Sequence, residues 1–131
     1  EEAIRMVASM GMGSRFHFTG FLNSDDVNAL LSQTDLYVMP SVSEPFGISP
    51  LEAVQAEVPV IISKQSGVSE ILKHAIKLDF WDTEALADTM YGILVHKPLS
   101  RLLSVGASAE VKSFTWDEAA RKIIKIYDQL T

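Results

Sequence analysis

The sequence predicts a single α/β domain built on a parallel sheet, and three observations lead to this prediction. Two short runs, Leu36–Met39 and Val58–Ile62, are apolar throughout, which is typical of strands buried on both faces. Segments with helical periodicity alternate with such runs, so we expect parallel pairing through right-handed crossovers. With 131 residues and 47% hydrophobic side chains, the chain can build one core.

The elements follow one another in an order that supports this class. We predict, in turn, a helix over 2–10 stopped by Gly11 and Gly13, a strand Arg15–Thr19 closed by Gly20, a helix starting at Asn23–Asp26, a strand Leu36–Met39, a helix Ser49–Glu57, a strand Val58–Ile62, a short helix Gly67–Lys73 and a strand Ala75–Leu78. Helices alone follow, over 82–95, 98–112 and 116–129. We therefore divide the domain into an α/β part, 1–80, and a helical tail, 81–131.

Composition excludes several classes of protein. A net charge of −6 with scattered basic residues argues against a nucleic-acid partner. The chain has no cysteine, which excludes disulfides and thiolate chemistry and fits a cytoplasmic protein, with a position at the inner membrane face also open. We find no signal peptide and no apolar run long enough to span a membrane.

The chain opens at Glu1 without methionine, in what reads as the middle of a helix. We therefore expect it to be a piece of a longer protein.

Two glutamates flank the turn that follows the strand Leu36–Met39. Glu44 lies in the loop, and Glu52 lies in the first turn of the next helix. One interpretation of Glu52 is structural: with Ser49 as N-cap and Pro50 at the first helical position, it completes a capping box. The same eight-residue spacing recurs at Glu110 and Glu118, where Glu118 reads as the capping partner of Thr115, so spacing alone carries little information.

The other interpretation is functional. A helix start offers unpaired N–H groups to an anion, and Gly47 permits close approach of a ligand to the backbone. Carboxylates beside that anion need other partners, and sugar hydroxyls suit them because an ionised carboxylate only accepts hydrogen bonds. A nucleotide-sugar, with hydroxyls on either side of a diphosphate, fits both requirements.

The segment that contains these two glutamates resembles a motif of a known family. EPFGISPLE resembles the E-x7-E signature of retaining glycosyltransferases of the GT-B fold, family 4 (glycosyl transferases group 1). Further segments match in the same order: RFHFTGF, DVNALLSQTDLYVMPS, VPVIISKQSGVSEIL and the Phe114-x-Trp116 pair before the last helix. The resemblance covers nearly the whole chain and implies the Rossmann-like, donor-binding C-terminal half of such an enzyme.

The resemblance also implies roles for individual residues. Glu44 would contact the hydroxyls of the donor sugar on the reacting face and is the candidate catalytic residue. The donor-binding candidates are Phe46 and Gly47 for the sugar, Ile48 and Ser49 for the diphosphate, Glu52 for the ribose, and Gly20 and Phe21 for the nucleobase. Gly67, with Glu70, would form a mainly structural rim. No metal or other cofactor is implied.

Two parts of the family pattern lie outside this sequence. The family's Arg and Lys that neutralise the leaving diphosphate would precede Glu1, and so would the acceptor-binding N-terminal domain and the first two strands of the sheet. Lys64 could replace the basic pair, or it could be a solvated surface lysine. We therefore expect the isolated chain to be inactive and its strand Arg15–Thr19 to pack elsewhere or to pair between copies.

The implied reaction is sugar transfer from a nucleotide diphosphate with retention of configuration. A role of Glu44 as a covalent nucleophile remains open. Two rival functions also remain open: a non-catalytic nucleotide-binding module, and a nucleotide-sugar epimerase of the GT-B type.

The other candidate residues have simpler interpretations. The three histidines share no metal-ligand spacing. Trp81 and Trp116 each precede a helix, and we expect them to anchor the helical tail to the core.

Overall fold

The computed structural model of the chain describes residues 1–130. Its elements, in chain order, are α1 (Glu2–Ser9), the 3-10 turn η1 (Gly13–Arg15), α2 (Ser24–Leu31), β1 (Tyr37–Met39), α3 (Ser49–Gln55), β2 (Val60–Ser63), the 3-10 turn η2 (Gly67–Glu70), β3 (Ile76–Leu78), α4 (Thr83–Val95), α5 (Lys97–Val111) and α6 (Trp116–Leu130).

The strands form a three-stranded parallel sheet in the order β1-β2-β3, which confirms the predicted α/β class. Tyr37 pairs with Val60, and Ile61 pairs with Ile76. Because all strands run the same way, their carboxyl ends lie at one edge of the sheet, where the loops that follow them can meet.

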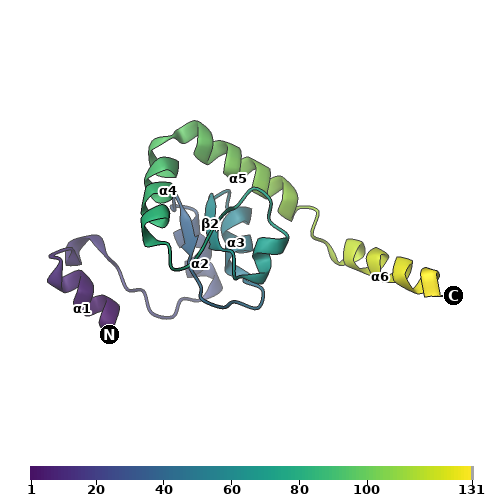
Figure 1. Ribbon diagram of the computed structural model, residues 1–131, viewed down its shortest axis with the longest axis horizontal. Coiled ribbons are helices and arrows are strands. Elements are labelled where there is room, and N and C mark those ends of the chain that lie inside the picture. The colour runs from purple at the N-terminus through teal and green to yellow at the C-terminus, as the bar shows by residue number, and fades with distance from the viewer. Residues whose placement is uncertain (131) are drawn as a thin grey trace.

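Helices cover both faces of this sheet (Figure 1). On one face, Met39 and Ile62 share a buried cluster with Val54 of α3 and Ala107 of α5. Ile61 points to the other face, where it lines a small void together with Leu86 of α4. Strands enclosed in this way carry apolar residues at every position, which is the pattern that the sequence showed.

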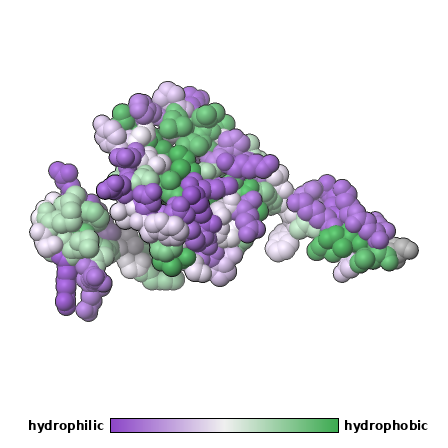
Figure 2. Space-filling view, in the orientation of Figure 1, coloured by the Kyte–Doolittle hydropathy of each residue, from purple (hydrophilic) through white to green (hydrophobic). Residues whose placement is uncertain are grey.

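The two ends of the chain project from this body (Figure 1). α1 and η1 are joined to α2 by an extended segment, and α6 extends away beyond the end of α5. Neither α1 nor α6 contains a buried residue. Figure 2 shows α6 hydrophilic along one side and hydrophobic along the other. Among residues 1–130, no helix is long and apolar enough to cross a membrane.

Three predictions about elements were wrong. Arg15–Thr19 forms no strand, because no strand lies beside it to complete its backbone hydrogen bonds; η1 ends at Arg15 and the residues after it are extended. The predicted helix Gly67–Lys73 is only a 3-10 turn ending at Glu70. Trp81 and Trp116 do not anchor the tail, since their side chains are 62% and 91% exposed.

Candidate functional site

The loop after β1 is held against the segment that follows β2. Glu44 forms a parallel bridge with Ser66, and the Gly67 N–H donates to the Glu44 carbonyl oxygen at 3.0 Å. The Val68 N–H donates to the Phe46 carbonyl oxygen at 2.6 Å. Backbone hydrogen bonds between two adjoining connections at the carboxyl edge of the sheet therefore hold the loop in place.

Two glycines make this close packing possible. A Cβ on Gly67 would lie 2.1 Å from the Pro45 carbonyl oxygen, so no larger residue fits there without moving the loop. Gly47 has a φ of +91° and is buried, with Met39 Cε 3.0 Å and Glu44 Cγ 3.3 Å from the position of its missing Cβ. The predicted turn at Gly47 and the predicted structural rim at Gly67 thus have clear steric causes.

The start of α3 differs from the predicted capping box. Ile48, and not Ser49, is the N-cap residue, and its φ of −73° and ψ of −37° are already helical. A capping serine needs an extended backbone so that its hydroxyl can reach an N–H one turn ahead. Ser49 lies inside the helix and makes no cap hydrogen bond, so the structural interpretation of Glu52 was wrong.

A row of unpaired backbone donors remains at this turn. Within residues 1–130, the amides of Phe46, Gly47, Ile48 and Ser49 donate no hydrogen bond to protein, and Pro50 has no N–H. Phe46, Ile48 and Ser49 are exposed. Because α3 has only seven residues, its dipole is small, and the anion-binding capacity comes from the amides themselves.

The two glutamates flank this row in the sequence. The Glu44 side chain is half-buried and the Glu52 side chain is exposed, and neither carboxylate makes a hydrogen bond or ion pair with another described residue. An ionised carboxylate with free lone pairs can accept from two hydroxyls at once. The loop therefore offers donors in the middle and acceptors on both sides.

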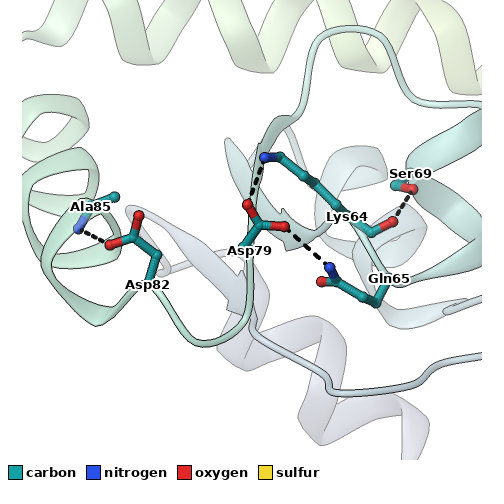
Figure 3. A network of polar contacts seen from close by, with 6 residues as sticks. All are labelled: Lys64, Gln65, Ser69, Asp79, Asp82 and Ala85. Atoms are coloured by element: carbon teal, nitrogen blue, oxygen red, sulfur yellow. Dashed lines mark hydrogen bonds and ion pairs between the residues drawn. The ribbon is translucent and has the colours of Figure 1, made fainter.

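A second set of polar side chains at the same edge of the sheet is paired within the chain (Figure 3). Lys64 Nζ lies 2.8 Å from Asp79 Oδ2, and Gln65 Nε2 donates to Asp79 Oδ1 at 3.2 Å. The hydrogen bond from Lys64, followed by that from Gln65, lowers the pKa of Asp79. The ammonium group that the sequence offered as a substitute cation is thus paired with a carboxylate of its own chain.

Lys64 was a candidate from the sequence, but Asp79 and Gln65 were not. A signal for both existed, because Lys64 directly follows β2 and Asp79 directly follows β3. Residues that follow neighbouring parallel strands lie at the same edge, which predicts their proximity.

Gly20 and Phe21 are not brought to this loop. They lie in the extended segment before α2, where Gly20 has a φ of +64°. The Phe21 side chain is 96% exposed, so it packs against nothing in the described chain. Their role at the nucleobase stays a prediction.

The Phe46 side chain connects the loop to the start of α6. Together with Phe114 and Trp116 it lines a groove of about 720 Å³. Among the described residues, no group of three His, Cys, Asp or Glu side chains is arranged to hold a metal ion.

Comparison with known proteins identifies relatives across most of the chain. The family described as glycosyl transferases group 1 matches residues 1–101. An uncharacterized glycosyltransferase of Methanocaldococcus jannaschii is 31% identical over 123 residues, which cover 90% of this chain and 31% of that protein.

Solved structures share the fold. Sucrose-phosphate synthase of Thermosynechococcus elongatus superposes with a TM-score of 0.82 at 26% identity, over 98% of this chain and 33% of that one. HepE of Anabaena, in complex with UDP-glucose, superposes with a TM-score of 0.82 at 21% identity, over 98% of this chain and 36% of that one. The chain thus spans about a third of the length of each of these three proteins.

Proposed function

Because the chain belongs to the glycosyl transferases group 1 family, we propose that it is the donor-binding part of a retaining glycosyltransferase, which moves a sugar from a nucleotide diphosphate to an acceptor. The observation that carries this proposal is the loop after β1. Four consecutive unpaired amides lie there between two carboxylates that have no partner in the described chain.

Each part of the donor has a counterpart in this loop. The amides of Ile48 and Ser49 bind the diphosphate, whose oxygens accept hydrogen bonds and carry the charge. The amides of Phe46 and Gly47 and the Glu44 carboxylate bind the sugar. Glu52 accepts hydrogen bonds from the ribose hydroxyls. This role is supported by the absence of a capping hydrogen bond at the start of α3, which leaves the Glu52 carboxylate available.

The same amides assist the reaction. As the bond between the sugar and the diphosphate breaks, negative charge grows on the diphosphate, and donors already fixed in place stabilise it without reorganising. No metal ion is needed in this scheme. Glu44 stays beside the reacting carbon, where a carboxylate stabilises the positive charge that develops on the sugar ring.

The remaining charge neutralisation comes from outside these residues. Lys64 is held 2.8 Å from Asp79, so this lysine is not a free cation beside the amides. An acceptor must also be bound by other parts of the longer protein. The 131-residue chain alone binds the donor and does not transfer the sugar.

Calorimetric titration of the chain with UDP and GDP tests the proposal. HepE, which shares the fold, was solved in complex with UDP-glucose, so UDP is the first ligand to try. We expect saturable binding of one of the two nucleotides, weakened about tenfold or more by Glu52→Gln, since a hydrogen bond to a charged carboxylate is lost. Glu84→Gln, an exposed substitution on α4, is the matched control.

Two results would overturn the proposal. One is that neither nucleotide binds. The other is that Glu52→Gln and Glu84→Gln weaken binding equally. In a glycosyltransferase that contains this chain, Glu44→Gln should abolish transfer and leave UDP affinity nearly unchanged, because Glu44 contacts the sugar and UDP carries none.

A further inference from the structure

Helix α5 is fixed to the body of the molecule at both of its ends. Near its start, Lys97 Nζ lies 3.4 Å from Asp35 Oδ1. Near its end, Glu110 accepts hydrogen bonds from the amides of Lys73 at 2.8 Å and His74 at 3.3 Å. Between these points the helix packs against α3 and α4. The side of α5 that faces away from these contacts is therefore held outward, and no rearrangement is needed to present it to a partner.

The outward side of α5 is apolar, although it faces water. The buried residues of the helix are Ser104, Ala107, Ser108 and Val111. On the opposite side, within a sector of about 60° at about 100° per residue, lies an outer stripe of four exposed residues: Pro98, Leu102, Val105 and Ala109. The Leu102 side chain is 66% exposed and the Val105 side chain is 56% exposed. Figure 2 shows hydrophobic side chains exposed over α5, at the top of the body. A helix whose outer side met only water would carry polar residues there.

Basic side chains accompany the outer stripe. Arg101 and Lys112 are exposed and lie next to the stripe on the same side of the helix, and neither forms an ion pair with another described residue. Among residues 89–112, Glu110 is the only acid, and its carboxylate is hydrogen-bonded within the chain. The surface of α5 is thus locally basic, although the chain as a whole has a net charge of −6. This charge complements a negatively charged partner.

We propose that the outer stripe of α5 docks on an anionic lipid surface. Leu102 and Val105 insert between the headgroups, and Arg101 and Lys112 bind the lipid phosphates. Apolar residues along one side of a helix with cations beside them are typical of helices that lie in the plane of a membrane interface. The cations make this docking selective for negatively charged lipids. The inference does not depend on nucleotide binding, because no residue of α5 belongs to the loop 44–49.

The size and the charge of the outer stripe favour a lipid surface over a protein partner. α5 has 15 residues, so with a length of about 22 Å and a width of about 10 Å the stripe offers about 220 Å². A stable protein interface buries about 800 Å² on each partner. A second copy of the chain would also bring the same cations against Arg101 and Lys112. A bilayer needs no such area, because a few inserted side chains and a few cations are enough for reversible docking.

Fluorescence from a label at one position tests where the chain meets lipid, and the absence of native cysteines makes the labelling selective. Ala109→Cys, on the outer stripe, is labelled with a fluorophore whose emission brightens and shifts to the blue when it leaves water. We expect this change on addition of vesicles that contain phosphatidylglycerol and phosphatidylcholine, and little change with phosphatidylcholine alone. Thr83→Cys, an exposed position at the start of α4, is the matched control and should show no change.

Three results would overturn the proposal. An unchanged label at Ala109→Cys in the presence of the anionic vesicles would mean that α5 stays in water. A response of a label at Ile126→Cys on α6, without one at Ala109→Cys, would mean that the chain meets lipid through its last helix instead. Equal responses of Ala109→Cys to both kinds of vesicle would mean that the cations beside the stripe play no part.

Co-sedimentation with the anionic vesicles separates the apolar contribution from the charged one. Val105→Ser should weaken partitioning about tenfold, whereas Val42→Ser, which replaces a valine that is 65% exposed outside α5, should change it by less than about twofold. Arg101→Gln should weaken partitioning about fivefold, and binding of the wild-type chain should fall as the salt concentration rises. All three side chains are exposed, so these variants keep the fold. Equal losses in Val105→Ser and Val42→Ser would contradict the proposal.

Discussion

At the carboxyl edge of the sheet, the polar groups that follow β2 and β3 are mostly paired, whereas those that follow β1 are not. After β2 and β3, Lys64 and Gln65 both donate to the Asp79 carboxylate, and the Ser66 hydroxyl donates to the Ser63 carbonyl oxygen at 2.7 Å. After β1, four amides and two carboxylates have no partner in the described chain, although the backbone of that loop is firmly held. The segment after β2 fixes the loop after β1. Ser63 Oγ and Gln65 Oε1 are buried without a partner among the described residues, whereas the loop after β1 offers four unpaired amides and two unpaired carboxylates to a ligand.

Gly67→Ala should push the loop after β1 away from the segment after β2 and cause the largest loss of stability. The new Cβ would lie 2.1 Å from the Pro45 carbonyl oxygen, so the two connections must separate. We expect a loss of about 3 kcal/mol in the free energy of unfolding, measured by urea denaturation. Gly92→Ala is the control: its Cβ meets no atom within 4 Å, and alanine in a helix should stabilise the protein slightly. Similar losses in both variants would contradict the steric argument.

The Glu110 carboxylate is hydrogen-bonded within the chain, in contrast to the carboxylates of Glu44 and Glu52. It accepts hydrogen bonds from the amides of Lys73 at 2.8 Å and His74 at 3.3 Å, and its Oε1 lies 2.7 Å from His74 Nδ1. Glu110→Ala should therefore cost about 2 kcal/mol of stability at pH 7, measured by urea denaturation.

The pH dependence of this cost follows from the pKa of Glu110. Burial raises that pKa, but the hydrogen bonds from His74 and from the two amides outweigh burial and lower it. The folded pKa thus lies below the unfolded one, so the contribution is complete above about pH 4.5 and is lost as the pH falls through the folded value. The stability difference between wild type and Glu110→Ala should shrink in that acid range. A difference that stays constant down to pH 2 would exclude the ionised carboxylate as its source.

Glu52→Gln should weaken UDP binding and leave the stability of the fold nearly unchanged. Glu52 makes no cap hydrogen bond, so its replacement should change the free energy of unfolding by less than about 0.5 kcal/mol while UDP affinity falls about tenfold. Urea denaturation and calorimetry on the same preparation measure the two quantities. A loss of about 1 kcal/mol of stability would restore the capping interpretation.

Asp79→Asn should have the smallest effect on binding. It weakens the ion pair with Lys64 but leaves the loop 44–49 unchanged, so UDP affinity should stay within about twofold of wild type. If the released Lys64 instead strengthened binding tenfold, this lysine would be the cation that stabilises the diphosphate.

Local patterns in the sequence predicted most of the body. Apolar runs identified β1 and β2, and Asn23 and Asp82 mark helix starts whose side chains do accept cap hydrogen bonds, from Asp26 and Ala85. The loop after β1, with its glycine turn, was also predicted, because Gly47 signals a positive φ and the flanking acids are visible in the sequence.

Features that depend on non-local partners were not predictable in the same way. Phe16 and Phe18 alternate as in a strand, but a strand forms only where another strand accepts its hydrogen bonds. Ser49 reads as an N-cap, but the backbone of Ile48 is already helical, so Ile48 is the N-cap and Ser49 is the first residue of α3. The exposure of Trp116 depends on where α6 packs, which its own sequence does not determine.

Backbone amide chemical shifts during a UDP titration show whether the loop after β1 binds the diphosphate. We expect the amides of Phe46, Gly47, Ile48 and Ser49 to shift together and to saturate at one affinity, while those of Lys64 and Gln65 shift little. UDP binding that leaves the first group unmoved, or that shifts only residues elsewhere, would contradict it.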